Sequence, residues 1–161
     1  MSPVDPHRGL VPSVLDRLMP QANRSTTPTR SEGVSVEQMI EAVRRDLEAL
    51  LNTRQSQGDL PKCYEELTHS VFTFGIPDVL VLSTMALERD GEMGPVIAEL
   101  IERFEPRLCD VQVVLADKDP LGREIRFHID GRLRVEPYPE LGFETVLELT
   151  TGRALITSSE G

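Results

Sequence analysis

The hydrophobic residues of this chain change their spacing at Pro106, and this change constrains the fold more than any other feature of the sequence. Before Pro106 they recur at helical intervals, as on one face of an amphipathic helix. After it they alternate with polar residues, as in strands with one buried and one solvated face. Helices followed by strands are typical of an α+β domain. We therefore predict an α+β fold with N-terminal helices packed on a small antiparallel sheet of about three to four strands.

The helical part of this domain is expected to begin at Ser35. Ser35 and Gln38 have the spacing of a capping box, in which each side chain bonds the backbone amide of the other residue. The helix that follows has a single apolar stripe, made of Val36, Met39, Ile40, Val43, Leu47, Leu50 and Leu51. We interpret this stripe as part of the hydrophobic core.

Two further helices are predicted before the sheet. Tyr64, Leu67 and Val71 have the spacing of a short helix, and Gly75 with the Ile76-Pro77 pair ends it in a tight, buried turn. The next helix runs from about residue 95 to residue 104, with Val96, Ile97, Leu100, Ile101 and Phe104 facing inward.

The residues after Pro106 are expected to form an antiparallel meander. The longest alternation has Ile125, Phe127, Ile129, Leu133 and Val135 on one face, and Glu124, Arg126, His128, Arg132, Arg134 and Glu136 on the other. The remaining strands are predicted at 111–116, 143–149 and 153–157. Because the strand 153–157 comes last, we expect it at an edge of the sheet, with an unpaired row of backbone groups that a partner strand can use.

The sequence predicts three parts. Val11, Val14, Leu15 and Leu18 have helical spacing, but this helix is too short to be stable alone, and the polar residues 20–34 that follow have the composition of a linker. We therefore expect a short helix with a flexible linker at 1–34, a folded domain at 35–157 and a polar tail at 158–161.

Charge and hydropathy exclude several classes of partner. The formal net charge is −10, from 27 acidic and 17 basic residues, which disfavours binding to a nucleic acid backbone. No segment has the roughly 20 continuous apolar residues of a membrane span, and the N-terminus has no apolar signal core. We expect a cytoplasmic protein without membrane insertion, in which Cys63 and Cys109 are free thiols.

The sequence offers no recognisable set of catalytic residues. His7, His69 and His128 share no metal-ligand spacing with one another or with the cysteines. We find no nucleophile motif and no glycine-rich phosphate loop. The prediction is therefore a protein that is not an enzyme, with no catalytic residue, no cofactor and no metal.

One short segment, Glu105-Pro106-Arg107, lies where the helices give way to the sheet. If it is extended, Glu105 and Arg107 point to the same side and Pro106 holds the backbone stiff between them. Two interpretations remain open. The first is a local surface ion pair worth at most about 1 kcal/mol. The second is a rigid two-pronged contact for a partner, since the proline already reduces the entropy cost of placing both groups.

Three segments, in order, resemble the TssE family. They are RRDLEALLNTR at 44–54, SVFTFGIPDV at 70–79 and IERFEPRL at 101–108. SVLDRL at 13–18 and the alternating run at 129–152 are similar to the beginning and the last strands of that family, so the resemblance covers about residues 13–152. The linker does not resemble the family, and DGEMG at 90–94 interrupts what is usually a more continuous helix.

This resemblance implies a structural role in the baseplate of a bacterial type VI secretion system, a phage-tail-like contractile machine. It implies TssF, TssG and TssK as baseplate partners, seeding of the TssB/TssC sheath, and a cytoplasmic location near the inner membrane complex. It also assigns partner binding to Glu105, Pro106 and Arg107. Two alternatives stay open: a regulatory adaptor that binds one protein, and a muramidase, which would need export to reach peptidoglycan.

Overall fold

The computed structural model describes residues 35–56, 64–78, 81, 93–118, 123–136 and 138–158. The chain divides into two compact units, residues 1–43 and residues 44–161, and the boundary falls inside helix α2 (Val36–Leu51). The helix predicted around residues 11–18, the linker at 20–34 and most of the predicted tail lie outside the described residues. The predicted division at 34 and 157 therefore stays a prediction.

Helix α2 begins with the predicted capping box. The backbone N–H of Gln38 donates to Ser35 Oγ at 3.3 Å, and the backbone N–H of Ser35 donates to Gln38 Oε1 at 3.2 Å. A hydrogen bond to the Ser35 side chain also lowers the pKa of Glu37, in the first turn. Of the predicted stripe, Met39, Val43, Leu47, Leu50 and Leu51 are buried. The capping-box prediction is confirmed.

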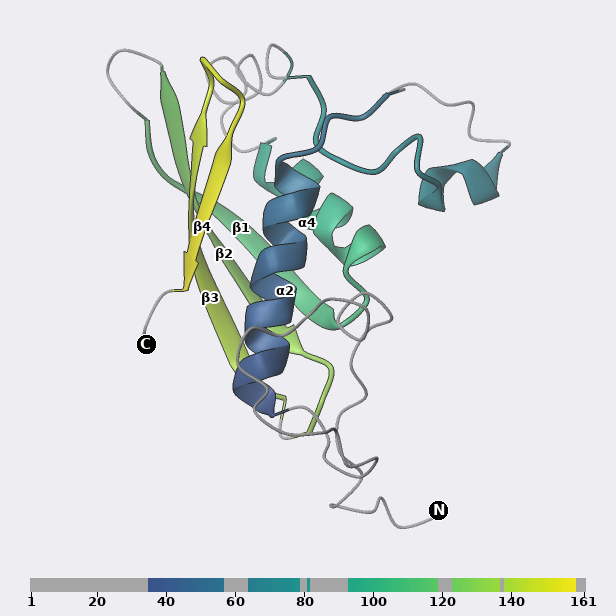
Figure 1. Cartoon of the computed structure of the whole chain (residues 1–161), viewed down its shortest axis with the longest axis vertical. Helices are drawn as coiled ribbons and strands as arrows, with labels where there is room; N and C mark the ends of the chain where they lie inside the picture. Colours follow the sequence, from purple (N-terminus) through teal and green to yellow (C-terminus); the bar gives the residue numbers. More distant parts are fainter. Residues whose placement is uncertain are drawn as a thin grey trace, which may run out of the picture. The chain divides into compact units, whose positions relative to one another are not determined.

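The sheet is a four-stranded antiparallel meander in the order β1-β2-β3-β4 (Figure 1). Its strands are β1 (Leu108–Lys118), β2 (Glu124–Leu133), β3 (Glu140–Glu148) and β4 (Ala154–Ser158). The α+β prediction is confirmed, and so is the placement of the last strand at an edge. The expectation of an unpaired row on that edge is wrong, because side chains of Arg44, Asn52 and Arg54 bond its outward backbone groups.

The alternation of apolar and polar residues predicted for β2 continues to Glu136, beyond the observed end of the strand. The strand ends at Leu133, and the chain then turns, with the N–H of Tyr138 donating to the Val135 carbonyl at 2.5 Å. The sequence EPYP at 136–139 explains the early end, because proline lacks the backbone donor that a strand ladder needs. Val135 therefore belongs to the turn and not to the strand.

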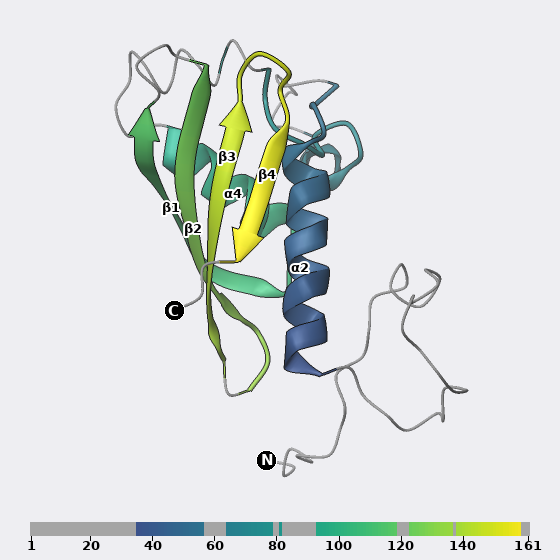
Figure 2. The same ribbon diagram turned by 60° about the vertical axis from the view of Figure 1, so that its left-hand side comes forward.

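One face of the sheet is covered and the other is bare. Helix α4 (Met93–Phe104) packs across β1, behind the sheet in the view of Figure 2. Their backbones approach closely, since a Cβ at Gly94 would clash with the Val113 carbonyl. The alternate residues that point toward the helices are buried, namely Ile125, Phe127, Ile129, Leu133, Leu141, Phe143, Thr145, Leu147, Ala154 and Ile156. The bare face carries charged residues with a few exposed apolar ones such as Val114 and Leu155.

The predicted second helix is only a five-residue 3₁₀ helix, η1 (Glu65–His69). Val71 lies beyond it and is 87% exposed, so the helix predicted from the spacing of Tyr64, Leu67 and Val71 is shorter than expected. Local hydrogen bonds hold the residues after η1 in turns instead: the Thr73 hydroxyl donates to the Thr68 carbonyl at 2.8 Å. The tight, buried turn predicted next is present, with Gly75 at a φ of 107° and Ile76 at 1% exposure. None of the helices in the described part of the chain is long and apolar enough to cross a membrane.

Candidate functional site

The segment Glu105-Pro106-Arg107 forms a turn between α4 and β1. The N–H of Leu108 donates to the Glu105 carbonyl at 3.1 Å, so Pro106 and Arg107 occupy the two central positions. The extended geometry expected from the sequence is therefore wrong. A fixed proline φ suits the second residue of a turn as well as it suits a strand, and here the chain must reverse direction between helix and sheet.

The predicted charged pair nevertheless forms within this turn. Arg107 Nε donates to Glu105 Oε1 at 2.6 Å, and Arg107 Nη2 donates to Glu105 Oε2 at 2.5 Å. The backbone N–H of Arg107 also donates to Glu105 Oε1, at 3.2 Å. A bidentate pair of this kind fixes the plane of the guanidinium as well as its position.

The pair is not on the surface, which corrects the first interpretation above. Glu105 is 4% exposed, and the side chain of Arg107 is 22% exposed. Glu105 lies under the turn because it directly follows α4, with its N–H still bonded to the Ile101 carbonyl at 2.7 Å. Pro106 is exposed, so the outward part of the turn is the proline and part of the arginine.

Helix α2 supplies a third member of this cluster that the sequence did not predict. Asp46 Oδ2 accepts a hydrogen bond from Arg107 Nη2 at 2.5 Å, and Asp46 Oδ1 lies 2.8 Å from Arg45 Nη2. The hydrogen bond that Arg107 donates to Glu105 is the main cause that raises the pKa of Arg107, with Asp46 contributing and burial opposing. Arg107 therefore stays charged, and its guanidinium ties α2 to the turn.

The turn is also bonded to the end of β2. The N–H of Arg134 donates to the Arg107 carbonyl at 2.7 Å, and Arg134 Nε donates to the Leu108 carbonyl at 3.1 Å. Contacts from α2, α4 and β2 thus hold the turn from three sides. The arrangement presents a rigid proline and a preorganised guanidinium, which suits binding to another protein more than it suits catalysis.

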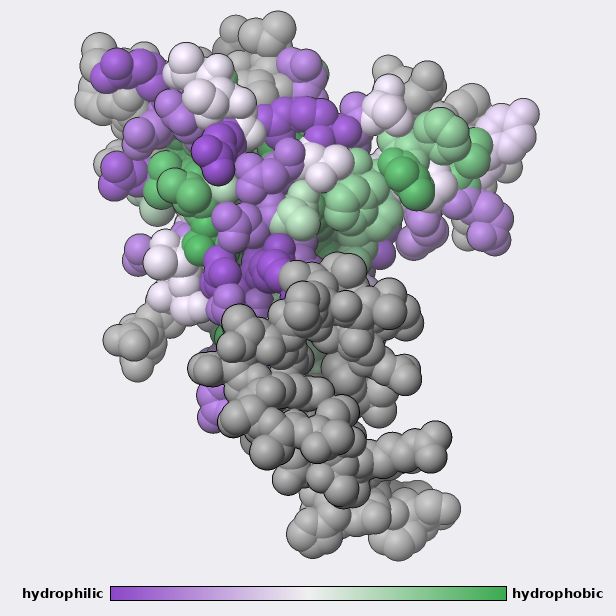
Figure 3. All heavy atoms as spheres, in the orientation of Figure 1, coloured by the Kyte–Doolittle hydropathy of each residue, from purple (hydrophilic) through white to green (hydrophobic). Residues whose placement is uncertain are grey.

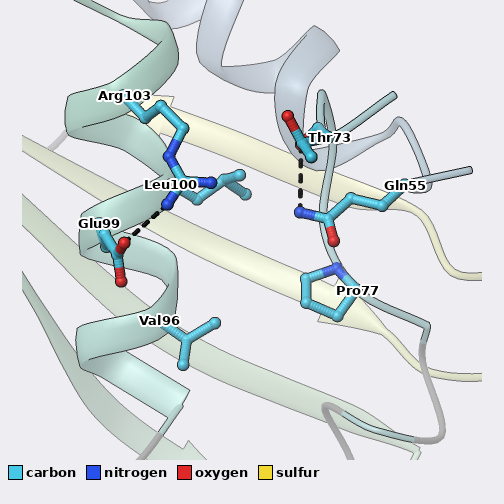
Figure 4. Close-up of a pocket in the computed structure, with 7 residues that line it drawn as sticks. All are labelled: Gln55, Thr73, Pro77, Val96, Glu99, Leu100 and Arg103. Atoms are coloured by element: carbon cyan, nitrogen blue, oxygen red, sulfur yellow. Dashed lines mark hydrogen bonds and ion pairs between the residues drawn. The ribbon is translucent and has the colours of Figure 1, made fainter. Parts of the chain in front are cut away.

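A shallow pocket lies between α4 and the residues that follow α2 and η1 (Figure 4). It has a volume of about 210 Å³ and is lined by Gln55, Thr73, Pro77, Val96, Glu99, Leu100 and Arg103. Among the described residues that line it, the one carboxylate, on Glu99, is 2.6 Å from Arg103 Nη2. A glycosidase typically uses two carboxyl groups across the scissile bond, and the described part of the lining supplies only one.

The other candidate residues do not come together. His69 is exposed at the end of η1, His128 Nε2 lies 3.0 Å from Asp130 Oδ1 on the bare face of the sheet, and His7 is outside the described residues. Cys109 is a free thiol that donates to the Arg132 carbonyl. Within the described ranges, no group of His, Cys, Asp and Glu is placed to hold a metal ion.

Exposed apolar residues gather around η1. Tyr64 is 56% exposed and Phe72 is 55% exposed, and Val71, directly before Phe72, is also exposed. Figure 3 shows apolar surface in this region, at the upper right of the view. Phe74, in contrast, packs edge-to-face on Phe104, with ring centroids 5.3 Å apart. The segment is therefore anchored by Phe74 and presents its other large side chains outward.

The family described as baseplate wedge protein gp25 matches residues 37–138, which is more than half of the chain and includes α4, the turn at 105–107 and all of α2 except Val36. No curated protein and no solved structure matches the chain significantly.

Proposed function

Because this chain belongs to the family of baseplate wedge protein gp25, which is also the family of TssE, we propose that it is the wedge subunit of a type VI secretion baseplate. The family has a structural role in phage-tail-like baseplates. The single observation that carries the proposal is the family match over residues 37–138. On this proposal the protein is non-catalytic and assembles with TssF, TssG and TssK in the cytoplasm, near the inner membrane complex, where its sheet seeds the TssB/TssC sheath.

We propose that the turn at Glu105, Pro106 and Arg107 is a contact for a baseplate partner. The three residues have different parts in this contact. Pro106 is exposed and Arg107 is partly exposed, so these two touch the partner. Glu105 is buried beneath them and acts as a positioning residue that holds the guanidinium of Arg107.

Preorganisation supports this assignment. A free arginine side chain loses rotamer entropy on binding, typically about 0.5 to 1.5 kcal/mol for each immobilised side chain. Arg107 already has its guanidinium fixed by Glu105 and Asp46. Pro106 likewise has a fixed φ and loses little on binding. The turn therefore binds a partner surface without first having to order itself.

The test is capture of purified TssF and TssG by the full chain carrying Pro106→Ala or Arg107→Lys. Lysine keeps the charge but cannot bond Glu105 in the bidentate manner, so we expect capture to weaken by about tenfold or more. Arg126→Lys is the matched control, because Arg126 forms an exposed ion pair with Glu124 on the bare face of the sheet, where each side chain is at least 41% exposed. Capture that is unchanged in both turn variants, with the fold intact, would remove the turn from the interface.

A further inference from the structure

The edge strand β4 has an outer row of backbone groups that face away from β3. In an antiparallel pair, residues alternate between those bonded to the partner strand and those facing outward. The N–H of Glu148 donates to the Arg153 carbonyl at 2.8 Å, which sets this alternation. Leu155, paired with Val146, is therefore bonded to β3, whereas the backbone groups of Ala154 and Ile156 face outward. The carbonyl of Gly152 also faces outward, but its N–H donates to the Glu148 carbonyl at 2.7 Å.

Side chains from α2 and the residues after it occupy this outer row. The Asn52 amide makes two bonds with Ala154: its Oδ1 accepts from the Ala154 N–H and its Nδ2 donates to the Ala154 carbonyl, both at 2.9 Å. Arg44 Nη1 donates to the Ile156 carbonyl at 3.3 Å, and Arg54 Nη2 donates to the Gly152 carbonyl. Figure 2 shows the part of α2 after Val43 running beside β4.

The two bonds of Asn52 reproduce those of a neighbouring strand. A strand residue that pairs with Ala154 would accept from its N–H and donate to its carbonyl, and a side-chain amide has the same acceptor and donor. Unpaired edges invite association with other chains, and natural proteins cover them by several means. Here the cover is a single short side chain, flanked by two arginines.

We infer that Asn52, with Arg44 and Arg54, forms an edge lock on β4, and that an extended strand of a neighbouring subunit pairs with β4 by displacing the Asn52 amide. In the isolated protein the lock keeps β4 from pairing with other chains. The identity of the incoming strand as part of the sheath rests on the proposed function above, whereas the lock itself does not.

The opposite edge of the sheet, formed by β1, is blocked by strand irregularities and by contacts with helix α4. β1 has register shifts between Cys109 and Gln112 and between Leu115 and Asp117, and such irregularities disfavour pairing. The N–H of Val111 donates to Glu102 Oε1 at 3.2 Å, and the Val113 carbonyl lies against Gly94. Opening that edge requires moving α4, whereas opening β4 requires rotation of side chains. The strand acceptor is therefore β4.

The outer side chains of β4 fit this role. Leu155 is 59% exposed on the bare face of the sheet, where a strand added beside β4 places a side chain against it. The incoming backbone replaces both Asn52 bonds to Ala154 and adds a bond to the Ile156 N–H, which faces the same way. Displacement of the lock therefore exchanges hydrogen bonds and gains a cross-strand apolar contact.

The test compares Asn52→Ala with the control Thr53→Ala in the full chain. The Thr53 hydroxyl donates to the Ala49 carbonyl at 2.8 Å at the C-terminal end of α2, so the control removes a neighbouring side-chain bond that does not involve β4. Amide hydrogen exchange is measured at Ala154 and Leu155. In Asn52→Ala we expect exchange at Ala154 to rise by about tenfold or more while Leu155, bonded to β3, is unchanged. The control should leave both amides unchanged.

A labelled peptide with the sequence of residues 153–158, RALITS, is the strand probe for the opened edge. Fluorescence anisotropy should show that Asn52→Ala binds it at least about tenfold more tightly than wild type or Thr53→Ala. Asn52→Asp keeps the acceptor for the Ala154 N–H and loses the donor to the Ala154 carbonyl. Its affinity for the peptide should lie between those of wild type and Asn52→Ala, and it replaces the alanine variant in the test if that variant is poorly folded. Equal exchange at Ala154 in all folded variants, or no gain in peptide binding, would overturn the edge lock.

These results are separable from those on the baseplate role. Failure of the lock with TssF and TssG capture retained removes only this inference. Failure of the wild-type chain to capture TssF and TssG, with Ala154 protected in wild type and exposed to exchange in Asn52→Ala, counts against only the proposed function.

Discussion

Replacing Glu105 by alanine is the perturbation whose outcome the structure constrains most closely. Glu105 is 4% exposed, and both of its carboxylate oxygens accept bonds from Arg107, at 2.6 and 2.5 Å. Removing one partner of a buried ion pair costs about 3 to 5 kcal/mol, because the other charge is left uncompensated. Arg107 is 22% exposed and keeps its bond to Asp46. We therefore expect a loss at the low end of that range, about 3 kcal/mol of unfolding free energy.

Urea denaturation of the isolated protein measures this loss. The midpoint of unfolding should fall in Glu105→Ala with the slope against urea unchanged, since the variant and the wild type expose the same amount of surface on unfolding. Glu124→Ala is the matched control, because Glu124 forms an exposed pair with Arg126 at 3.3 Å. Its expected loss is at most about 1 kcal/mol. If Glu105→Ala were no less stable than Glu124→Ala, the buried position of Glu105 would be refuted.

A double variant shows whether the side chains of Glu105 and Arg107 stabilise the fold by interacting with each other or independently. Arg107→Ala leaves the carboxylate of Glu105 unpaired at a buried position, so its loss should equal or exceed that of Glu105→Ala. The double variant Glu105→Ala with Arg107→Ala buries no unpaired charge and should lose less than the sum of the two single changes. Additive losses would mean that the two side chains do not interact.

Three further predictions concern other parts of the chain. Ser35→Ala should raise the pKa of Glu37 toward its ordinary value, and an NMR titration that shows no change would contradict this. Because the pKa of Glu37 is lowered in the folded state, the stabilisation that Glu37 provides is present above its unfolded pKa and is lost as the pH falls through its folded pKa. Thr145 is 1% exposed and its hydroxyl finds no hydrogen-bond partner among the described residues, so Thr145→Val should stabilise the protein by about 1 kcal/mol in thermal unfolding, whereas a loss of that size would reveal a bonded hydroxyl. Purified protein should release no muropeptides from peptidoglycan above the buffer level, and dose-dependent release that one carboxylate substitution abolishes would contradict a non-catalytic role.

The fold class and its main elements could be predicted because they depend on local spacing. The apolar stripe of α2, its capping box at Ser35 and the change of period after Pro106 each involve residues close together in the chain. The placement of β4 at an edge followed from its position as the last strand of a meander. These features need no knowledge of which distant segments meet.

The errors occurred where distant contacts decide the outcome. Asp46 lies 61 residues before Arg107, and no spacing in the sequence indicates that the two side chains meet. Nor does the pattern of β4 reveal that Asn52, 102 residues away from Ala154, covers its outer row. The sequence does not distinguish an extended segment from a turn at Glu105 to Arg107, because proline is compatible with both conformations. The reversal from α4 into β1 selects the turn.

The assignment as a baseplate wedge subunit is tested most directly by quantitative affinity purification of the full chain from a cell that produces it, followed by mass spectrometry. The account predicts that TssF and TssG are recovered with the wild-type chain in fixed ratio, together with TssK, and that Arg107→Lys lowers their recovery while the variant remains folded. Recovery of an unfoldase adaptor complex without TssF and TssG would contradict the account and favour a regulatory adaptor.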